Sequence, residues 1–159
     1  MQPMRSNPPD EEKMRLRLAD LCARTEQCRH DLDQKMRRAG LSEEGRWRVL
    51  DELERGGFID ERRYACAFSR DKVRFAGWGR QKIRQALSAK RLDSDAIDEG
   101  LRAISRDEYI GSLKRSALAK ARQLDLSLPA DRMKLYRHLA SRGFESAFIS
   151  KIVSYLGSF

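Results

Sequence analysis

The chain has 159 residues and a mass of 18.4 kDa, which suits one ordinary domain or a short array of repeats. Its composition, 40% hydrophobic and 36% charged, excludes a wholly disordered chain and favours an elongated shape, and no apolar run approaches the roughly 20 residues that a membrane span needs. Lys and Arg number 33 against 24 Asp and Glu, and the net charge of +9 indicates a polyanionic partner.

Good helix formers dominate the sequence, and only four prolines occur, at 3, 8, 9 and 129. Apolar residues recur at intervals of three and four, as in Ile83 with Leu87, which is the period of a helix and not of a strand. The sequence therefore predicts an all-α protein. The expected helices cover residues 10–25, 28–39, 43–55, 61–75, 80–90, 94–104, 107–124, 130–141 and 145–157.

Several of these helices have recognisable boundaries. Ser42, Asp60 and Asp93 are expected as N-caps, whose side-chain oxygens accept hydrogen bonds from the first helical N–H groups. Gly56-Gly57 supplies a C-terminal stop, and Pro129 stands in a first turn, where proline is tolerated.

Three segments align in one register, starting at Arg29, Arg80 and Arg132, with spacings of 51 and 52 residues. Apolar side chains recur three, seven and twelve residues after each start, and the residue eleven positions after the start lies in a turn. The apolar sets are Leu32, Ile83 and Leu135; Met36, Leu87 and Leu139; and Leu41, Leu92 and Phe144, while the turn holds Gly40, Arg91 and Gly143.

The register continues into a second helix of each segment. One position departs from it, because Arg46 stands where the later segments have Ile97 and Ile149, and Trp47 is expected to cover that surface instead. Another helix precedes each pair, so each unit has three helices.

One such unit buries too little apolar surface to stand alone, and the units must therefore stack. The expected division is a disordered tail over 1–9, followed by helical repeats over 10–57, 58–106 and 107–159. A single helical globule with coincidental periodicity is the alternative.

Charge follows the same division. Residues 62–91 contain ten basic residues and one acid, Asp71, and their net charge of +9 equals that of the whole chain. Because like charges in one helix pair cost stability, this concentration favours contact with a polyanion over a merely solvated basic face. The candidate binding residues are Arg70, Lys72, Arg74, Trp78, Arg80, Lys82, Arg84 and Arg91, with a secondary basic surface at Lys114, Arg115, Lys120 and Arg122.

Aromatic residues lie within and beside this segment. Trp78, between two glycines in Phe75-Ala-Gly-Trp-Gly79, is placed to stack on a base or anchor a partner, or equally to pack between two helices. Phe58, Tyr64 and Phe68 are expected in the core.

No sequence feature indicates catalysis or a bound cofactor. There is no Walker A, GxGxxG or HExxH pattern, and two histidines, His30 and His138, do not suggest a metal site. Cys22, Cys28 and Cys66 form no CxxC pair and suit free thiols in a reducing cytoplasm.

Several segments in and next to the second repeat resemble the central motif of RecX regulatory proteins. The similar segments are Gly57-Phe-Ile-Asp-Glu-Arg-Arg-Tyr-Ala65, Phe68-Ser-Arg-Asp71 and Gly77-Trp-Gly-Arg-Gln-Lys-Ile83. The stretch from Arg132 to Phe144 is similar to the last repeat of that family, and the resemblance spans roughly residues 16–157. The first repeat fits least well, since Cys28 stands where the family often has a serine cap.

The resemblance implies an elongated, curved array of three tandem three-helix repeats. It implies binding to the RecA recombinase assembled on single-stranded DNA, and suppression of its ATP hydrolysis, strand exchange and coprotease activity. It implies no catalytic residue. With the basic surface, we expect nonspecific contact with single- and double-stranded DNA, no membrane contact, and a monomer.

Two other classes remain open on the residues alone. One is a nonspecific helical DNA-binding protein without a RecA role, since basic helices of helix–turn–helix units also bind DNA. The other is a helical scaffold that binds an acidic protein.

Overall fold

The computed structural model describes residues 8–158, which form nine α-helices and one π-helical turn and contain no strand. The helices are α1 (Pro8–Arg24), α2 (Arg29–Arg38), α3 (Glu43–Arg55), α4 (Glu61–Asp71), α5 (Arg80–Ala89), α6 (Ser94–Arg102), α7 (Arg106–Ala121), α8 (Pro129–Ser141) and α9 (Ser146–Leu156), and the π-helical turn η1 spans Lys72–Ala76.

The predicted helix boundaries are confirmed to within a few residues. Ser42 Oγ accepts a hydrogen bond from the Gly45 N–H at 3.1 Å, and Asp60 and Asp93 cap α4 and α6 through their carboxylates. Pro129 opens α8. The expected tail over 1–9 lies outside the described residues, except for positions 8 and 9, with which α1 begins.

Residues 72–76 differ from the prediction of one helix over 61–75. The helix widens there into the π-helical turn. This turn ends at Gly77, whose φ of 64° lies in the left-handed region. Two carbonyl groups of the turn accept hydrogen bonds from side chains of α7 and of the end of α8. Ser112 Oγ donates to the Val73 carbonyl at 2.9 Å, and Arg142 donates to the Ala76 carbonyl. Tertiary contacts with α7 and the end of α8 thus hold this segment, which helix periodicity alone does not reveal.

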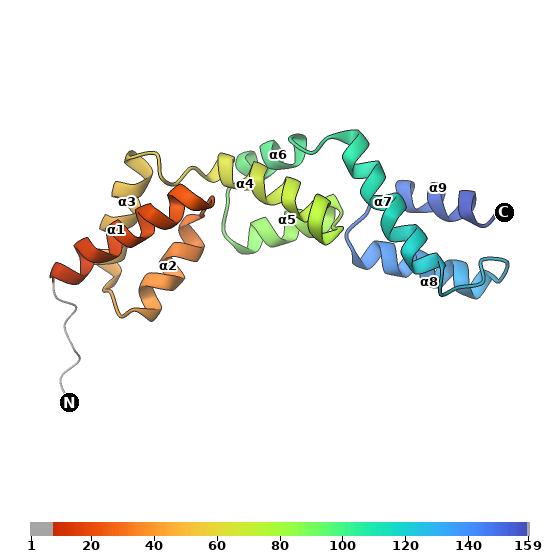
Figure 1. The fold of residues 1–159 in the computed structure, drawn as a ribbon, viewed down its shortest axis with the longest axis horizontal. Helices are drawn as coiled ribbons and strands as arrows, with labels where there is room; N and C mark the ends of the chain where they lie inside the picture. The colour runs from red at the N-terminus through yellow and green to blue at the C-terminus, as the bar shows by residue number, and fades with distance from the viewer. Residues whose placement is uncertain (1–7, 159) are drawn as a thin grey trace, which may run out of the picture.

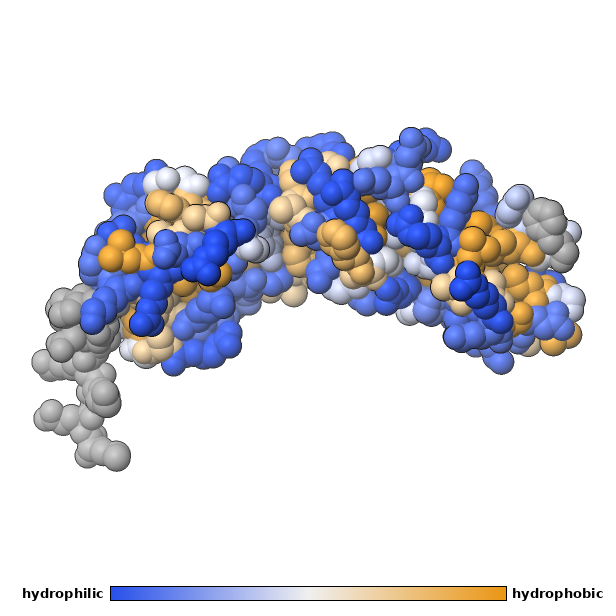
Figure 2. Space-filling view, viewed as in Figure 1, coloured by the Kyte–Doolittle hydropathy of each residue, from blue (hydrophilic) through white to orange (hydrophobic). Residues whose placement is uncertain are grey.

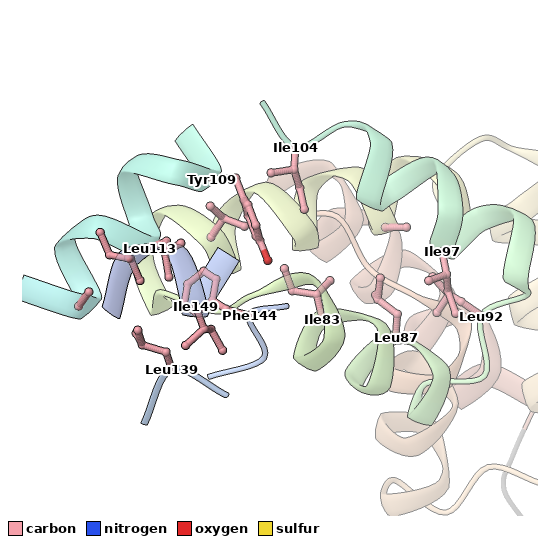
Figure 3. Close-up of a cluster of buried hydrophobic side chains, with 14 of the residues drawn as sticks. Ile83, Leu87, Leu92, Ile97, Ile104, Tyr109, Leu113, Leu139, Phe144 and Ile149 are labelled. Carbon is pink, nitrogen blue, oxygen red and sulfur yellow. The ribbon is translucent and has the colours of Figure 1, made fainter. Parts of the chain in front are cut away.

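The helices are arranged as an arch of three groups along the chain, α1–α3, α4–α6 and α7–α9 (Figure 1). The first group has its own core, which includes Leu32, Met36 and Leu53. The second and third groups share one larger core. Figure 3 shows side chains from α5 through α9 meeting in it, including Ile83, Tyr109 and Phe144.

Two expectations about side chains in the core are wrong. Arg46 is itself buried, because its guanidinium forms an ion pair with Asp33 at 2.8 Å and donates to the Leu41 carbonyl, whereas Trp47 is 58% exposed. Phe58 is 38% exposed, and the neighbouring Ile59 is buried in its place.

The second and third groups meet through their backbones. The Gly79 N–H donates to the Arg142 carbonyl at 2.7 Å, and the Gln81 N–H donates to the Gly143 carbonyl at 3.0 Å. A Cβ on Gly79 would lie 2.3 Å from the backbone of Gly143, and one on Gly143 would lie 2.5 Å from Lys82. The start of α5 therefore reaches the turn after α8 only because both positions are glycine.

The first and second groups meet through side chains instead. Lys90 Nζ lies 2.7 Å from a carboxylate oxygen of Asp31, and Arg63 forms an ion pair with Glu26 at 2.6 Å. In the repeat register, Cys28 corresponds to Gly79 and Arg91 to Gly143. Arg91 keeps the left-handed turn with a φ of 62°, but both residues carry a Cβ, and the backbone contact of the other junction is not repeated.

We expect Gly79→Ala to destabilise the protein by about 2–4 kcal/mol, because the added methyl group separates the second and third groups. The matched control is Gly111→Ala in α7, where an added Cβ would meet only the Arg115 side chain at 3.4 Å. That change should stabilise the helix by about 0.5–1 kcal/mol. Urea unfolding of the two variants and the parent measures both effects, and equal stability of all three would contradict this account of the junction.

The cysteines should differ in reactivity. Burial raises the pKa of the Cys28 thiol to about 11, so hardly any thiolate forms there at pH 8, and Cys22 is also buried. Cys66 is half-buried and more accessible. With a thiol-specific disulfide reagent, one fast modification at Cys66 is expected in the native protein and three in denaturant. Mass spectrometry identifies the site, and fast labelling of Cys28 would contradict the described packing.

Candidate functional site

Charge is divided between the two sides of the arch. The second helix of each group, α2, α5 and α8, lies on its inner side, and the third helices α3, α6 and α9 lie on the other side (Figure 1). Basic residues outnumber acidic ones four to two in α2, three to none in α5 and three to one in α8. In α3 acids outnumber bases five to three, and in α6 three to one, whereas α9 has one lysine and no acid. All three inner helices therefore have a net positive charge, and two of the three outer helices have a net negative charge.

Trp78 lies at the centre of the basic segment and is held between two lysines. Lys72 Nζ and Lys82 Nζ each lie 4.6 Å from the centre of its ring, and Phe68 meets it edge-on at 6.2 Å. Trp78 is half-buried and packs against the larger core, so it serves packing and also forms part of the surface. The cation–π contacts keep both ammonium groups against one ring, so two positive charges lie around Trp78.

Phe75 is exposed beside this cluster, and the sequence analysis did not select it as a binding residue. It is 82% exposed, the most of any described large hydrophobic side chain. It lines a groove of about 650 Å³ together with Lys72, Phe68 and Arg24. Its position in the π-helical turn explains why it was missed. In a regular helix from 61 to 75 it would follow Phe68 by seven residues and Tyr64 by eleven, onto the buried face.

Three of the predicted binding residues are engaged within the protein. Arg74 pairs with Glu108 at 2.8 Å, and Arg84 pairs with Asp98 at 2.7 Å, both on the surface. Arg80 lies deeper in the junction between the second and third groups. Its guanidinium stacks 3.9 Å from the centre of the Tyr109 ring and pairs with Glu145 at 3.3 Å.

A hydrogen-bonded chain continues from Arg80. Its N–H donates to the Tyr109 hydroxyl at 3.1 Å, and that hydroxyl donates to Glu145 at 2.7 Å. Burial is the main cause that raises the pKa of Tyr109, so this hydroxyl stays protonated and keeps both bonds. Arg80 thus supports the fold as well as the charge of α5.

The other predicted residues are spread over the surface. Arg70 is exposed on α4 and donates to the Ala103 carbonyl at 3.4 Å. Arg91 lines a different groove, at the junction of the first two groups, with Arg29, Arg37 and Lys90.

The secondary basic residues do not form one surface. Lys114 lines a groove between α7 and α9, whereas Lys120 lines a different pocket with His138 and Arg142. Arg115 and Arg122 are exposed. Burial, followed by the charges of Lys120 and Arg142, lowers the pKa of His138, so at neutral pH this histidine adds little positive charge.

Two further classes of site are not found in the described part of the chain. Residues 8–158 contain no group of three or more His, Cys, Asp or Glu side chains placed to hold a metal ion. None of the described helices is both long enough and apolar enough to cross a membrane.

Comparison with known proteins gives a consistent result. Residues 60–101 match the family model described as RecX, second three-helix domain. The chain is 34% identical over 137 residues to the regulatory protein RecX of Pseudomonas entomophila (strain L48), covering 85% of this chain and 86% of that protein. The chain belongs to the RecX family. The regulatory protein RecX of Prosthecochloris aestuarii (strain DSM 271 / SK 413) is 31% identical over 133 residues, covering 82% of this chain and 85% of that protein.

Solved RecX structures share the fold. A crystal structure of RecX from Lactobacillus salivarius aligns over 96% of this chain and 100% of that one, with a TM-score of 0.77 and 18% identity. Another crystal structure of regulatory protein RecX aligns over 91% of this chain and 71% of that one, with a TM-score of 0.77 and 23% identity. The expected family and the curved all-helical repeat array are confirmed. Because RecX proteins are regulators, the expectation of a regulator and not an enzyme is confirmed too.

Arg80 and Arg74 should respond differently to truncation, although both are arginines of the basic segment. Arg80→Ala removes the stacking and the ion pair in the junction, and we expect a loss of about 1–3 kcal/mol in the free energy of unfolding. Arg74→Ala removes only an exposed pair and should leave the unfolding midpoint nearly unchanged. Chemical denaturation followed by circular dichroism tests this, and an equal loss in both variants would contradict a structural role for Arg80.

Proposed function

We propose that this protein binds the RecA filament on single-stranded DNA and restrains its ATP hydrolysis, strand exchange and coprotease activity. Membership of the RecX family supports a regulatory role, and the positive inner side of the arch supports a polyanionic partner. The observation that carries the proposal is the cluster of Lys72, Trp78 and Lys82. Two ammonium groups share one aromatic ring there, and neither has an acidic partner in the described residues.

The proposed mechanism is steric and electrostatic. An array of three stacked groups is long enough to lie against more than one subunit of a helical filament, which blocks the motion or the incoming strand that exchange requires. The cluster faces DNA phosphate or an acidic filament surface, and the exposed Phe75 beside it supplies an apolar contact, either for a base or for a protein side chain. Each phosphate that a lysine neutralises adds affinity and salt dependence.

The binding residues are proposed in two classes. Lys72, Lys82, Phe75 and Arg70 contact the partner directly. Trp78 positions the two lysines through its ring. The remaining predicted arginines act through the charge that they lend to the surface, because Arg74, Arg80 and Arg84 are already paired and Arg91 lies in another groove. We further propose that the protein acts as a monomer in the cytoplasm, where its three free thiols remain reduced.

The test is a titration of single-stranded-DNA-dependent ATP hydrolysis by the cognate RecA. We expect inhibition well below one molecule per RecA subunit, because one bound molecule affects several subunits. Lys72→Ala with Lys82→Ala should weaken inhibition at least tenfold. The matched control is Lys13→Ala with Arg17→Ala, which removes two exposed charges from α1, so both variants have the same net charge.

Salt dependence provides a second measurement on the same pair of variants. If both lysines contact phosphate, the double variant should reduce the slope of log affinity for single-stranded DNA against log salt by roughly 1.4, while the control leaves it unchanged. Full inhibition by the Lys72 and Lys82 variant would remove this cluster from the mechanism. Intact DNA binding without any inhibition of RecA would instead establish a nonspecific DNA-binding protein, and inhibition abolished by excess DNA would reduce the effect to competition for the strand.

A further inference from the structure

An apolar groove of about 740 Å³ lies between α7 and α9, at the opposite end of the chain from α1. Its floor is formed by buried or half-buried side chains, among them Leu113, Phe148 and Ile152. Leu118 and Tyr155 line it while remaining 49% and 60% exposed. Figure 2 shows apolar side chains gathered at this end of the molecule.

The groove exists because of two residues that differ from their counterparts in the second group. There, Gly100 of α6 packs on Ala65 of α4 so closely that an added Cβ would lie 2.8 Å from the Ala65 Cβ. In the repeat register Gly100 corresponds to Ile152, and when the first helices are aligned at their N-caps, Asp60 and Ser105, Ala65 corresponds to Ile110. The larger isoleucine side chains keep α9 away from α7, and the space that α4 and α6 close remains open.

The rim of the groove is entirely basic. Arg106, Lys114 and Lys151 line it, and none of the lining residues in the described part of the chain is acidic. Helix α9 has no acid over its whole length, and α7 has none after Glu108, which is paired with Arg74. Lys114 and Lys151 are both exposed, and no ion pair engages either of them in residues 8–158.

We propose that this groove binds an acidic amphipathic helix of a partner protein. The apolar floor selects a stripe of leucine-like side chains at i, i+3, i+4 and i+7, and the basic rim selects Glu or Asp on either side of the stripe. Nucleic acid fits this surface poorly, because its phosphates would have to lie over an apolar floor. A second copy of the chain also fits poorly, since it would bring a basic rim against a basic rim.

This site differs from the cluster of Lys72, Trp78 and Lys82 and does not depend on it. None of these three residues lines the groove between α7 and α9. The protein therefore has separate surfaces for a polyanion and for a helical segment. A test with neither RecA nor DNA present addresses the groove alone, so its outcome is independent of the proposed regulation of RecA.

The probe is a fluorescein-labelled peptide of roughly 18 residues, long enough to form a helix, with leucines along one face and glutamates on the others. Fluorescence anisotropy with the full chain measures its dissociation constant. Two further peptides serve as references: one has lysine in place of each glutamate, and the other has serine in place of each leucine. We expect the acidic leucine peptide to bind at least tenfold more tightly than either.

The variants address the rim and the floor separately. Lys114→Glu with Lys151→Glu should weaken binding of the acidic peptide at least tenfold, and so should Leu118→Glu. These side chains are exposed, so the fold should be retained, as circular dichroism would verify. Lys13→Glu with Arg17→Glu makes the same change in net charge at the far end of the array and should alter the affinity less than twofold.

Three outcomes would overturn the proposal. One is equal binding of the acidic and basic peptides, since the rim would then have no selectivity. Another is the same loss of affinity in the control as in the rim variant, because net charge alone would explain the binding. The third is concentration-dependent dimerisation in sedimentation velocity that Leu118→Glu abolishes, since a second copy would then occupy the groove.

Discussion

The close approach of two glycines fixes the relation between the second and third groups of helices. Gly79 and Gly143 have no side chains, so the start of α5 can donate two backbone hydrogen bonds to the turn after α8. That contact brings Tyr109 under Arg80 and merges the two groups into one core. Helices α5 and α8 follow one another along the inner side of the arch, and both are basic (Figure 1). The backbone contact therefore leaves the basic helices of two repeats on one side of the molecule.

The register of the repeats predicted most of this fold from the sequence. Apolar positions three and seven residues after Arg29, Arg80 and Arg132 are all buried, and the N-caps are found at the expected residues. The exception at Arg46 has a clear physical reason. A periodic pattern reports which positions are buried but not what satisfies a polar group there, and so the pairing of Arg46 with Asp33 was not predicted.

The candidate site was less predictable than the fold. Sequence places Lys72, Arg74 and Arg80 within a few residues of one another, yet only the structure shows that Glu108 and Glu145 engage two of them. These acids lie 34 and 65 residues away along the chain, in the next repeat, and no local pattern links them. Phe75 was missed for a related reason, because a π-helical turn changes the direction of a side chain without altering composition.

The two junctions of the array are built differently, and this gives them unequal sensitivity to salt. Backbone hydrogen bonds and a shared core join α4–α6 to α7–α9. The first group is linked to the second by ion pairs such as Lys90 with Asp31, and also by Cys28, which is buried in the larger core. Ions in solution screen such pairs far more than they affect buried apolar contacts. Rising ionic strength should therefore weaken the first junction before the second, because backbone hydrogen bonds and the shared core still hold the second when its ion pairs are screened.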